Sequence, residues 1–208
     1  MTTGQSIVIG IESAVEGGSI SVFADGLEIL SRSGNGTVAR AEELLPAIDS
    51  ILRELKMSVR DVGTIAVATG PGSFTGIRVG IATVLGLRTA LQIRCVGISS
   101  TQAMALSDSD SNNVIAAVPM GRDMICSQVF SKHRPLGPPR IVTIEEINAS
   151  VDAFEGKVLL HKTIYDQVSV GVRPGVCDVG RNLASYIAAV ADTEYVSEDL
   201  SPVFVDRK

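Results

Sequence analysis

A glycine-rich turn between a buried strand and a helix constrains the fold of this chain more than any other feature. Residues 62–69 (VGTIAVAT) are apolar and uncharged, as in a strand buried on both faces. Three glycines follow within residues 70–76, and an apolar helix is predicted over residues 77–92. Free N–H groups and the dipole at a helix N-terminus attract anions, so this unit is typical of a phosphate site. The same pattern fits a tight turn capped by a Ser or Thr side chain, and the sequence leaves both interpretations open.

The turn departs from the common phosphate-binding motifs. A P-loop requires GxxxxGK[ST], but no Lys follows Gly76, and a dinucleotide turn requires GxGxxG, whereas residues 70–76 read GxGxxxG. A carboxylate at the end of the first predicted strand would suit a metal–phosphate complex, although a lone Glu at a strand end is more often a solvated charge. The candidate anion- or nucleotide-binding residues are Glu12, Ser13, Gly70, Gly72, Ser73, Thr75 and Gly76.

Two glycines, Gly76 and Gly80, lie four residues apart and therefore share one face of the predicted helix. A glycine inside a helix costs about 0.5–1 kcal/mol relative to alanine, so the pair indicates that another segment approaches closely. That segment belongs either to the chain's own core or to a partner protein.

The hydrophobic pattern predicts an α/β fold of two lobes. Asp25-Gly26 is typical of a hairpin turn, and Pro46 would kink the first helix or delay its start. The first half has the predicted order βββαβαβα, over residues 6–12, 19–24, 27–33, 41–56, 62–69, 77–92, 94–97 and 100–108. A shorter, β-rich copy follows, with strands over 114–118, 124–132 and 158–160 and helices over 143–148 and 178–190. The polar run at 108–113 separates the two, so we predict lobes at 1–108 and 109–208.

Composition limits the function and the location of the protein. The 18 Lys and Arg residues and 23 Asp and Glu residues give a net charge of −5, and aromatic residues make up 4% with no Trp. Nucleic-acid binding depends on clustered cations and on aromatic rings that stack on bases, so we do not expect this chain to bind nucleic acid by itself. The three cysteines are far apart, the N-terminus lacks a signal-peptide pattern, and no run of 18 uncharged apolar residues occurs. We therefore expect a cytoplasmic protein without a membrane segment.

No catalytic constellation is visible in the sequence. His133 and His161 are isolated, and neither an HExxH pattern nor a GxSxG nucleophile turn occurs. We therefore predict no catalytic residue and no metal site in this chain.

Residues 70–80, GPGSFTGIRVG, resemble the signature of the TsaB (YeaZ) family. The likeness continues in Glu42–Pro46 (EELLP), Val96–Ser100 (VGISS) and Ser201–Arg207 (SPVFVDR). The family belongs to the actin/Hsp70-like ATPase superfamily, so the resemblance implies a two-lobed, ribonuclease H-like fold with an abbreviated second lobe.

The resemblance also implies a function and partners. It implies a non-catalytic scaffold or activating subunit of the complex that forms N6-threonylcarbamoyladenosine next to the anticodon of tRNA. Its partners would be a TsaD-like catalytic subunit and a TsaE-like ATPase, with tRNA reached only through the complex and a homodimer formed by the chain alone. This chain would require no cofactor, and ATP or ADP would bind at a partner interface. The implied interface residues on the two long helices are Leu45, Ile48, Leu52, Gly76, Arg78, Gly80 and Val84.

Three departures from the family pattern bear on nucleotide binding. Glu12 stands where the family usually has Asp, Arg40-Ala41 where it often has His-Ser, and Pro119–Gly121 where it usually has Asp-Ala-Arg. These changes remove polar groups from the expected cleft between the lobes and leave the scaffold role untouched. The alternative is an ATP-dependent phosphotransferase or ATPase of the same fold that uses the loop at residues 70–76.

Overall fold

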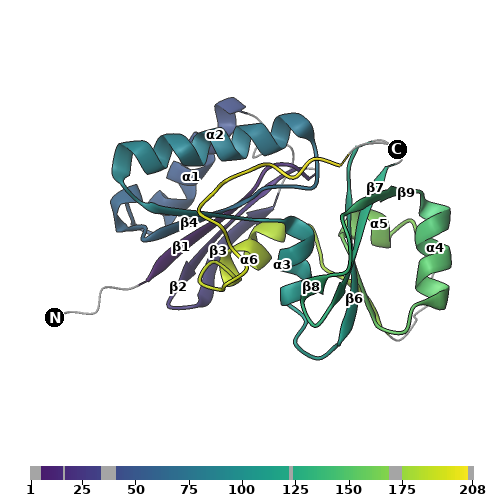
Figure 1. The fold of residues 1–208 in the computed structure, drawn as a ribbon. Helices are drawn as coiled ribbons and strands as arrows, with labels where there is room; N and C mark the ends of the chain where they lie inside the picture. The colour runs from purple at the N-terminus through teal and green to yellow at the C-terminus, as the bar shows by residue number, and fades with distance from the viewer. Residues whose placement is uncertain (1–5, 16, 34–40, 122–123, 169–174, 206–208) are drawn as a thin grey trace.

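The computed structural model describes residues 6–15, 17–33, 41–121, 124–168 and 175–205 as two lobes built on two sheets (Figure 1). The sheet of the first lobe has the strand order β3-β2-β1-β4-β5. Its strands are β1 (Ile7–Glu12), β2 (Ser19–Ala24), β3 (Leu27–Ser33), β4 (Thr64–Ala68) and β5 (Arg94–Ile98). β1 pairs antiparallel with β2 and parallel with β4. The predicted hairpin at Asp25-Gly26 joins β2 to β3, with positive φ angles of 51° and 80° at its two turn residues.

Helices cover both faces of this sheet (Figure 1). α1 (Ala41–Glu54) and α2 (Phe74–Leu91) pack on the face that carries Ile7, Ile9 and Ile11, with the short 3-10 helix η1 (Val59–Asp61) between them in sequence. α3 (Ser100–Leu106) and α6 (Leu183–Ala189) pack on the opposite face. α6 lies so close that a Cβ at Gly10 would be 2.2 Å from a backbone oxygen of α6. Alternating side chains on fully buried strands thus fill two cores.

The sheet of the second lobe has the order β11-β10-β6-β7-β8, and β9 also pairs with β7. Its elements are β6 (Asn113–Pro119), β7 (Ile125–Ser131), β8 (Arg134–Pro135), β9 (Arg140–Val142), β10 (Lys157–Leu160) and β11 (Val176–Asp178), with helices α4 (Ile144–Ala153) and α5 (Lys162–Tyr165). β6 pairs antiparallel with β7 and parallel with β10, as β1 does with β2 and β4. The predicted repeat of the first lobe is therefore confirmed in its topology, as is the predicted two-lobed fold.

Several element boundaries differ from the predictions. α2 begins at Phe74, because Ser73 caps it and the last residues of the glycine-rich segment form its first turn. α1 continues through Pro46 to Glu54, since its buried stripe against the sheet outweighs the hydrogen bond that a proline lacks. The helix predicted over 178–190 is shorter and follows a strand, β11, that the sequence pattern did not reveal.

The end of the chain returns to the first sheet. Ser197 exchanges two backbone hydrogen bonds with Gly97 of β5, at 2.7 and 3.0 Å, and the Val203 N–H donates to the Thr69 carbonyl at 2.7 Å. Leu200 between them is buried in the core under α1 and α2. The predicted boundary at residue 108 thus separates the two sheets, whereas α6 and residues 197–203 lie mainly against the first sheet although they follow the second.

Candidate functional site

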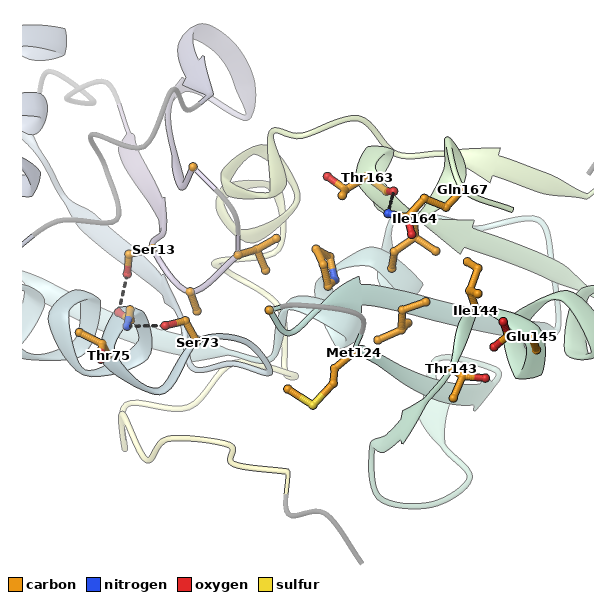
Figure 2. A pocket seen from close by; sticks show the side chains of 17 residues that line it. Ser13, Ser73, Thr75, Met124, Thr143, Ile144, Glu145, Thr163, Ile164 and Gln167 are labelled. Carbon is orange, nitrogen blue, oxygen red and sulfur yellow. Dashed lines mark hydrogen bonds between the residues drawn. The ribbon is translucent and has the colours of Figure 1, made fainter. Parts of the chain in front are cut away.

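A cleft of about 910 Å³ lies between the two lobes (Figure 2). The first lobe contributes the residues after β1 and the first turn of α2, and the second lobe contributes the ends of β6 and β7 and parts of α4 and α5. The described lining residues are Ser13, Ala14, Val15, Gly17, Ser73, Thr75, Gly76, Pro119, Gly121, Met124, Ile125, Thr143, Ile144, Glu145, Thr163, Ile164 and Gln167. Glu145 is the one charged residue among them, so the described walls offer small hydroxyls and apolar surface.

The glycine-rich turn forms one wall of this cleft. The Ser73 side chain accepts a hydrogen bond from the Gly76 N–H at 3.3 Å, which caps α2, and the Ser73 N–H donates to the Ala14 carbonyl at 2.7 Å. Gly70 adopts a φ of +111°, and a Cβ there would lie 2.6 Å from the Val203 carbonyl oxygen. The turn therefore takes part in packing and capping, as the second sequence interpretation describes, and the anion-site interpretation stays open.

Six of the seven candidate anion-binding residues separate into two groups. Ser13, Ser73, Thr75 and Gly76 line the cleft, so the structure brings four of the seven together. Gly70 faces the C-terminal segment, and Gly72 faces Ala14 after β1, with 2.6 Å between a Cβ there and the Ala14 carbonyl oxygen. These two glycines are needed for close backbone packing. Anion binding by the first group stays a prediction.

Glu12 is buried at the end of β1, with 1% of its surface exposed. Its Oε1 accepts hydrogen bonds from the N–H groups of Ala14 at 2.6 Å and Val15 at 2.9 Å. Burial raises the pKa of this carboxyl to about 7, against the opposing effect of the two backbone hydrogen bonds. The expectation of a solvated charge is therefore wrong, and Glu12 does not line the cleft either. Its carboxyl instead holds the turn that leads from β1 to the cleft.

Gly76 and Gly80 pack against this same turn. A Cβ at Gly76 would lie 2.1 Å from the Ser13 carbonyl oxygen, and one at Gly80 would lie 2.4 Å from the Ser13 Oγ. The Ser13 hydroxyl also donates to the Gly76 carbonyl at 2.9 Å. The two glycines therefore allow α2 to approach β1 inside the lobe, and a large side chain at Gly80 would disturb the fold before it reached a partner.

Most of the predicted interface residues also belong to the core. Ile48, Leu52 and Val84 are fully buried against the first sheet, so their assignment to an interface is wrong. Helical periodicity identifies an apolar stripe, and that stripe faces the sheet. Leu45 and Arg78 are exposed as predicted for a surface.

The outward face of α2 carries both apolar and polar side chains. Of its 18 residues, the buried ones are Gly76, Ile77, Gly80, Ile81 and Val84. The other side has a shallow groove of about 390 Å³ lined by Phe74, Thr75, Arg78, Val79, Ala82 and Thr83. Among the described residues, α2 is the one helix that meets the length and composition of a membrane span. Val79, Leu85, Leu87 and Leu91 are partly buried against the first core, so the groove is an open part of α2.

An aromatic pair beside this groove was not recognised from the sequence. The rings of Phe74 and Phe204 lie 4.8 Å apart between centroids at an interplanar angle of 34°. The Arg78 guanidinium lies 3.8 Å from the centroid of the Phe74 ring. The available signal was a Phe inside the glycine-rich motif of a chain with few aromatic residues.

A partly buried ion pair joins Asp108, near the boundary between the lobes, to β10 of the second lobe. The Lys157 Nζ at the start of β10 donates to the Asp108 Oδ1 at 2.9 Å, and Asp108 is almost fully buried. Burial opposes ionisation of Asp108, but hydrogen bonds from Lys157, Ser111 and Asp110 outweigh it and hold the pKa of this carboxyl below its ordinary value.

No group of three or more His, Cys, Asp or Glu side chains suited to a metal occurs in the part of the chain that the structure describes.

Comparisons with known proteins agree with this fold. Residues 37–176 match the family model TsaD, tRNA N6-adenosine threonylcarbamoyltransferase. The chain is 29% identical over 119 residues to the tRNA threonylcarbamoyladenosine biosynthesis protein TsaB of Escherichia coli, a match covering 53% of this chain and 49% of that protein. It is 31% identical over 99 residues to TsaB of Buchnera aphidicola, covering 48% and 47%. The chain thus spans about half the length of the curated relatives it matches.

Solved structures share the fold over nearly the whole chain. YeaZ from Pseudomonas aeruginosa superimposes with a TM-score of 0.69 at 20% identity, covering 95% of this chain and 99% of that one. The ethanolamine utilization protein EutJ from Carboxydothermus hydrogenoformans gives a TM-score of 0.54 at 10% identity, covering 92% and 90%. The chain therefore belongs to the family that the TsaD model describes, and its predicted likeness to the TsaB (YeaZ) proteins is confirmed.

Proposed function

We propose that this chain is a non-catalytic subunit of the complex that forms N6-threonylcarbamoyladenosine in tRNA, and that it docks on a TsaD-like catalytic subunit. The names of the curated relatives and the description of the family model support the pathway. The observation that favours docking is the groove on the outward side of α2, where the Phe74 ring and Ala82 are exposed to solvent beside Val79.

The chemistry of the cleft supports a role outside catalysis. Its described lining holds one carboxylate, Glu145, and no cation, whereas phosphoryl transfer relies on cations or metal ions that neutralise developing charge. In the proposed complex this chain needs no cofactor of its own, and ATP or ADP binds at a partner interface, with a TsaE-like ATPase as a further subunit. A chain with a net charge of −5 reaches tRNA through its partners. The setting is the cytoplasm, and the chain alone forms a homodimer through the same face.

The docking face is tested by placing a long, charged side chain on it. Ala82→Arg projects into the groove on α2, and Ala153→Arg is the matched control on the exposed end of α4, in the other lobe. We expect Ala82→Arg to weaken binding to the TsaD-like protein at least tenfold by titration calorimetry, and Ala153→Arg to change it less than twofold. The proposal fails if the wild-type chain and the TsaD-like protein run as separate monomers at micromolar concentration and deletion of the chain leaves the tRNA modification intact.

The cleft itself favours a second candidate, an ATP-dependent phosphotransferase or ATPase. Its volume of about 910 Å³ lies within the range of ligand pockets, and a helix N-terminus opens into it. This candidate predicts Mg-ATP binding and turnover by the isolated chain. Calorimetry that detects no binding at millimolar Mg-ATP would eliminate it.

A further inference from the structure

The C-terminal segment, residues 197–205, is fastened across the first lobe as far as the start of α2. It pairs with β5 at Ser197, buries Leu200, and ends with the Val203 N–H bonded to the Thr69 carbonyl. Figure 1 shows this segment, in yellow, crossing back from α6 over the first lobe. These contacts place the next residue, Phe204, against the ring of Phe74.

The two rings are exposed to solvent at one end of the groove on α2. Phe74 is 51% exposed and Phe204 is 43% exposed, although the whole chain has only five Phe, three Tyr and no Trp. The Arg78 guanidinium also lies over the Phe74 ring and makes no ion pair with any residue that the structure describes. Exposed aromatic rings together with an arginine are the composition of binding hot spots.

We propose that Phe204 of the C-terminal segment joins Phe74 and Arg78 in one docking surface for the TsaD-like partner. The inference rests on the proposed function and adds to it a contribution from the far end of the chain. The stack is continuous with the α2 groove through Phe74 and Arg78, both of which line that groove. The occupant is therefore a protein surface with an apolar segment for the groove and rings and a carboxylate for the guanidinium of Arg78.

The anchors of the segment lie upstream of the ring, so its contribution can be separated from folding. Ser197 and Val203 make the backbone hydrogen bonds and Leu200 the core contact, whereas the Phe204 side chain is 43% exposed and lies against the ring of Phe74. Replacement of the Phe204 side chain by Ala should therefore leave the thermal unfolding midpoint nearly unchanged. Phe204→Leu keeps apolar bulk and serves as the conservative variant.

The test measures the dissociation constant for the TsaD-like protein by titration calorimetry. We expect Phe204→Ala and Phe74→Ala each to weaken binding about tenfold or more, and Phe204→Leu to restore part of the loss. The double variant should lose less than the product of the single losses, because the two rings act as one unit. The control is Leu136→Ala, which removes an equally apolar, 68% exposed side chain from the second lobe and should change binding less than twofold.

Two results overturn the inference while leaving the proposed function standing. One is wild-type pairing with the TsaD-like protein that Phe204→Ala leaves within twofold. The other is a loss of self-association in Phe204→Ala, measured by sedimentation, with unchanged binding to the TsaD-like protein, which would make a second copy of the chain the occupant. Failure of the wild-type chain to pair at all overturns the proposed function and the inference together.

Discussion

The buried carboxyl of Glu12 makes the stability of this protein depend on pH in a specific direction. Burial raises its pKa from 4.5 to about 7, so between these values the folded chain holds a proton that the unfolded chain releases. The stabilising contribution of the neutral carboxyl is therefore complete below pH 4.5 and is lost as the pH rises to 7. At 1.36 kcal/mol per pKa unit, the loss amounts to about 3 kcal/mol.

Glu12→Gln isolates this effect. The Gln side chain keeps an oxygen that can accept from the Ala14 and Val15 N–H groups, as the Glu12 Oε1 does, but it cannot ionise. We expect the variant and the wild type to have similar free energies of unfolding at pH 5. At pH 8 the variant should be more stable by up to about 3 kcal/mol, because only the wild type then has to bury a charge or take up a proton.

Urea unfolding at pH 5 and pH 8, followed by circular dichroism, measures the difference. Glu155→Gln is the matched control, since Glu155 is exposed on the surface of the second lobe, and it should change the free energy of unfolding by less than about 0.5 kcal/mol at both pH values. The reasoning is refuted if the advantage of Glu12→Gln stays constant with pH. It is also refuted if the wild type gains on the variant as the pH rises, because the backbone N–H groups would then favour the ionised carboxyl.

Two further predictions concern packing and charge inside the molecule. Gly76→Ala should cost about 2–4 kcal/mol or prevent folding, because its Cβ would meet the Ser13 carbonyl oxygen at 2.1 Å. On the same helix, a Cβ at Gly86 would meet nothing within 4 Å, so Gly86→Ala should stabilise the protein by about 0.5–1 kcal/mol. Thermal unfolding of the two variants measures the difference, and equal melting temperatures would contradict this prediction. Lys157→Met should destabilise the protein by about 2–3 kcal/mol at pH 7, since Asp108 would stay buried without its cation. This deficit should shrink as Asp108 is protonated in acid, because a lowered pKa contributes stability only above it, and a deficit that urea unfolding finds unchanged at low pH would argue against the ion pair.

Local sequence patterns predicted the first lobe well because they act within a few residues. The Asp25-Gly26 turn, the buried strand before the glycine-rich segment and the helix after it all follow from backbone preference and periodicity. The second lobe was predicted less completely. Its outer strands, such as β11 at Val176–Asp178, have only a few residues each and gain their stability from neighbours that the sequence does not place next to them.

The candidate site depended more on tertiary structure. Periodicity marked Ile48, Leu52 and Val84 as an apolar stripe, but an apolar stripe looks the same whether it faces the sheet or a partner. The glycine pair had the same ambiguity, and only the position of Ser13 against Gly76 resolved it in favour of the core.

The sequence by itself determined the order of strands and helices in the first lobe, the glycine-rich turn and the family, because each depends on residues that lie close together along the chain. Tertiary structure alone decided that Glu12 is buried, that α2 carries an exposed groove and that Phe204 contacts Phe74. The physical reason is that burial and contact depend on which distant segments fold against each other. The most informative surface of this protein therefore combines the start of α2 with the end of the chain.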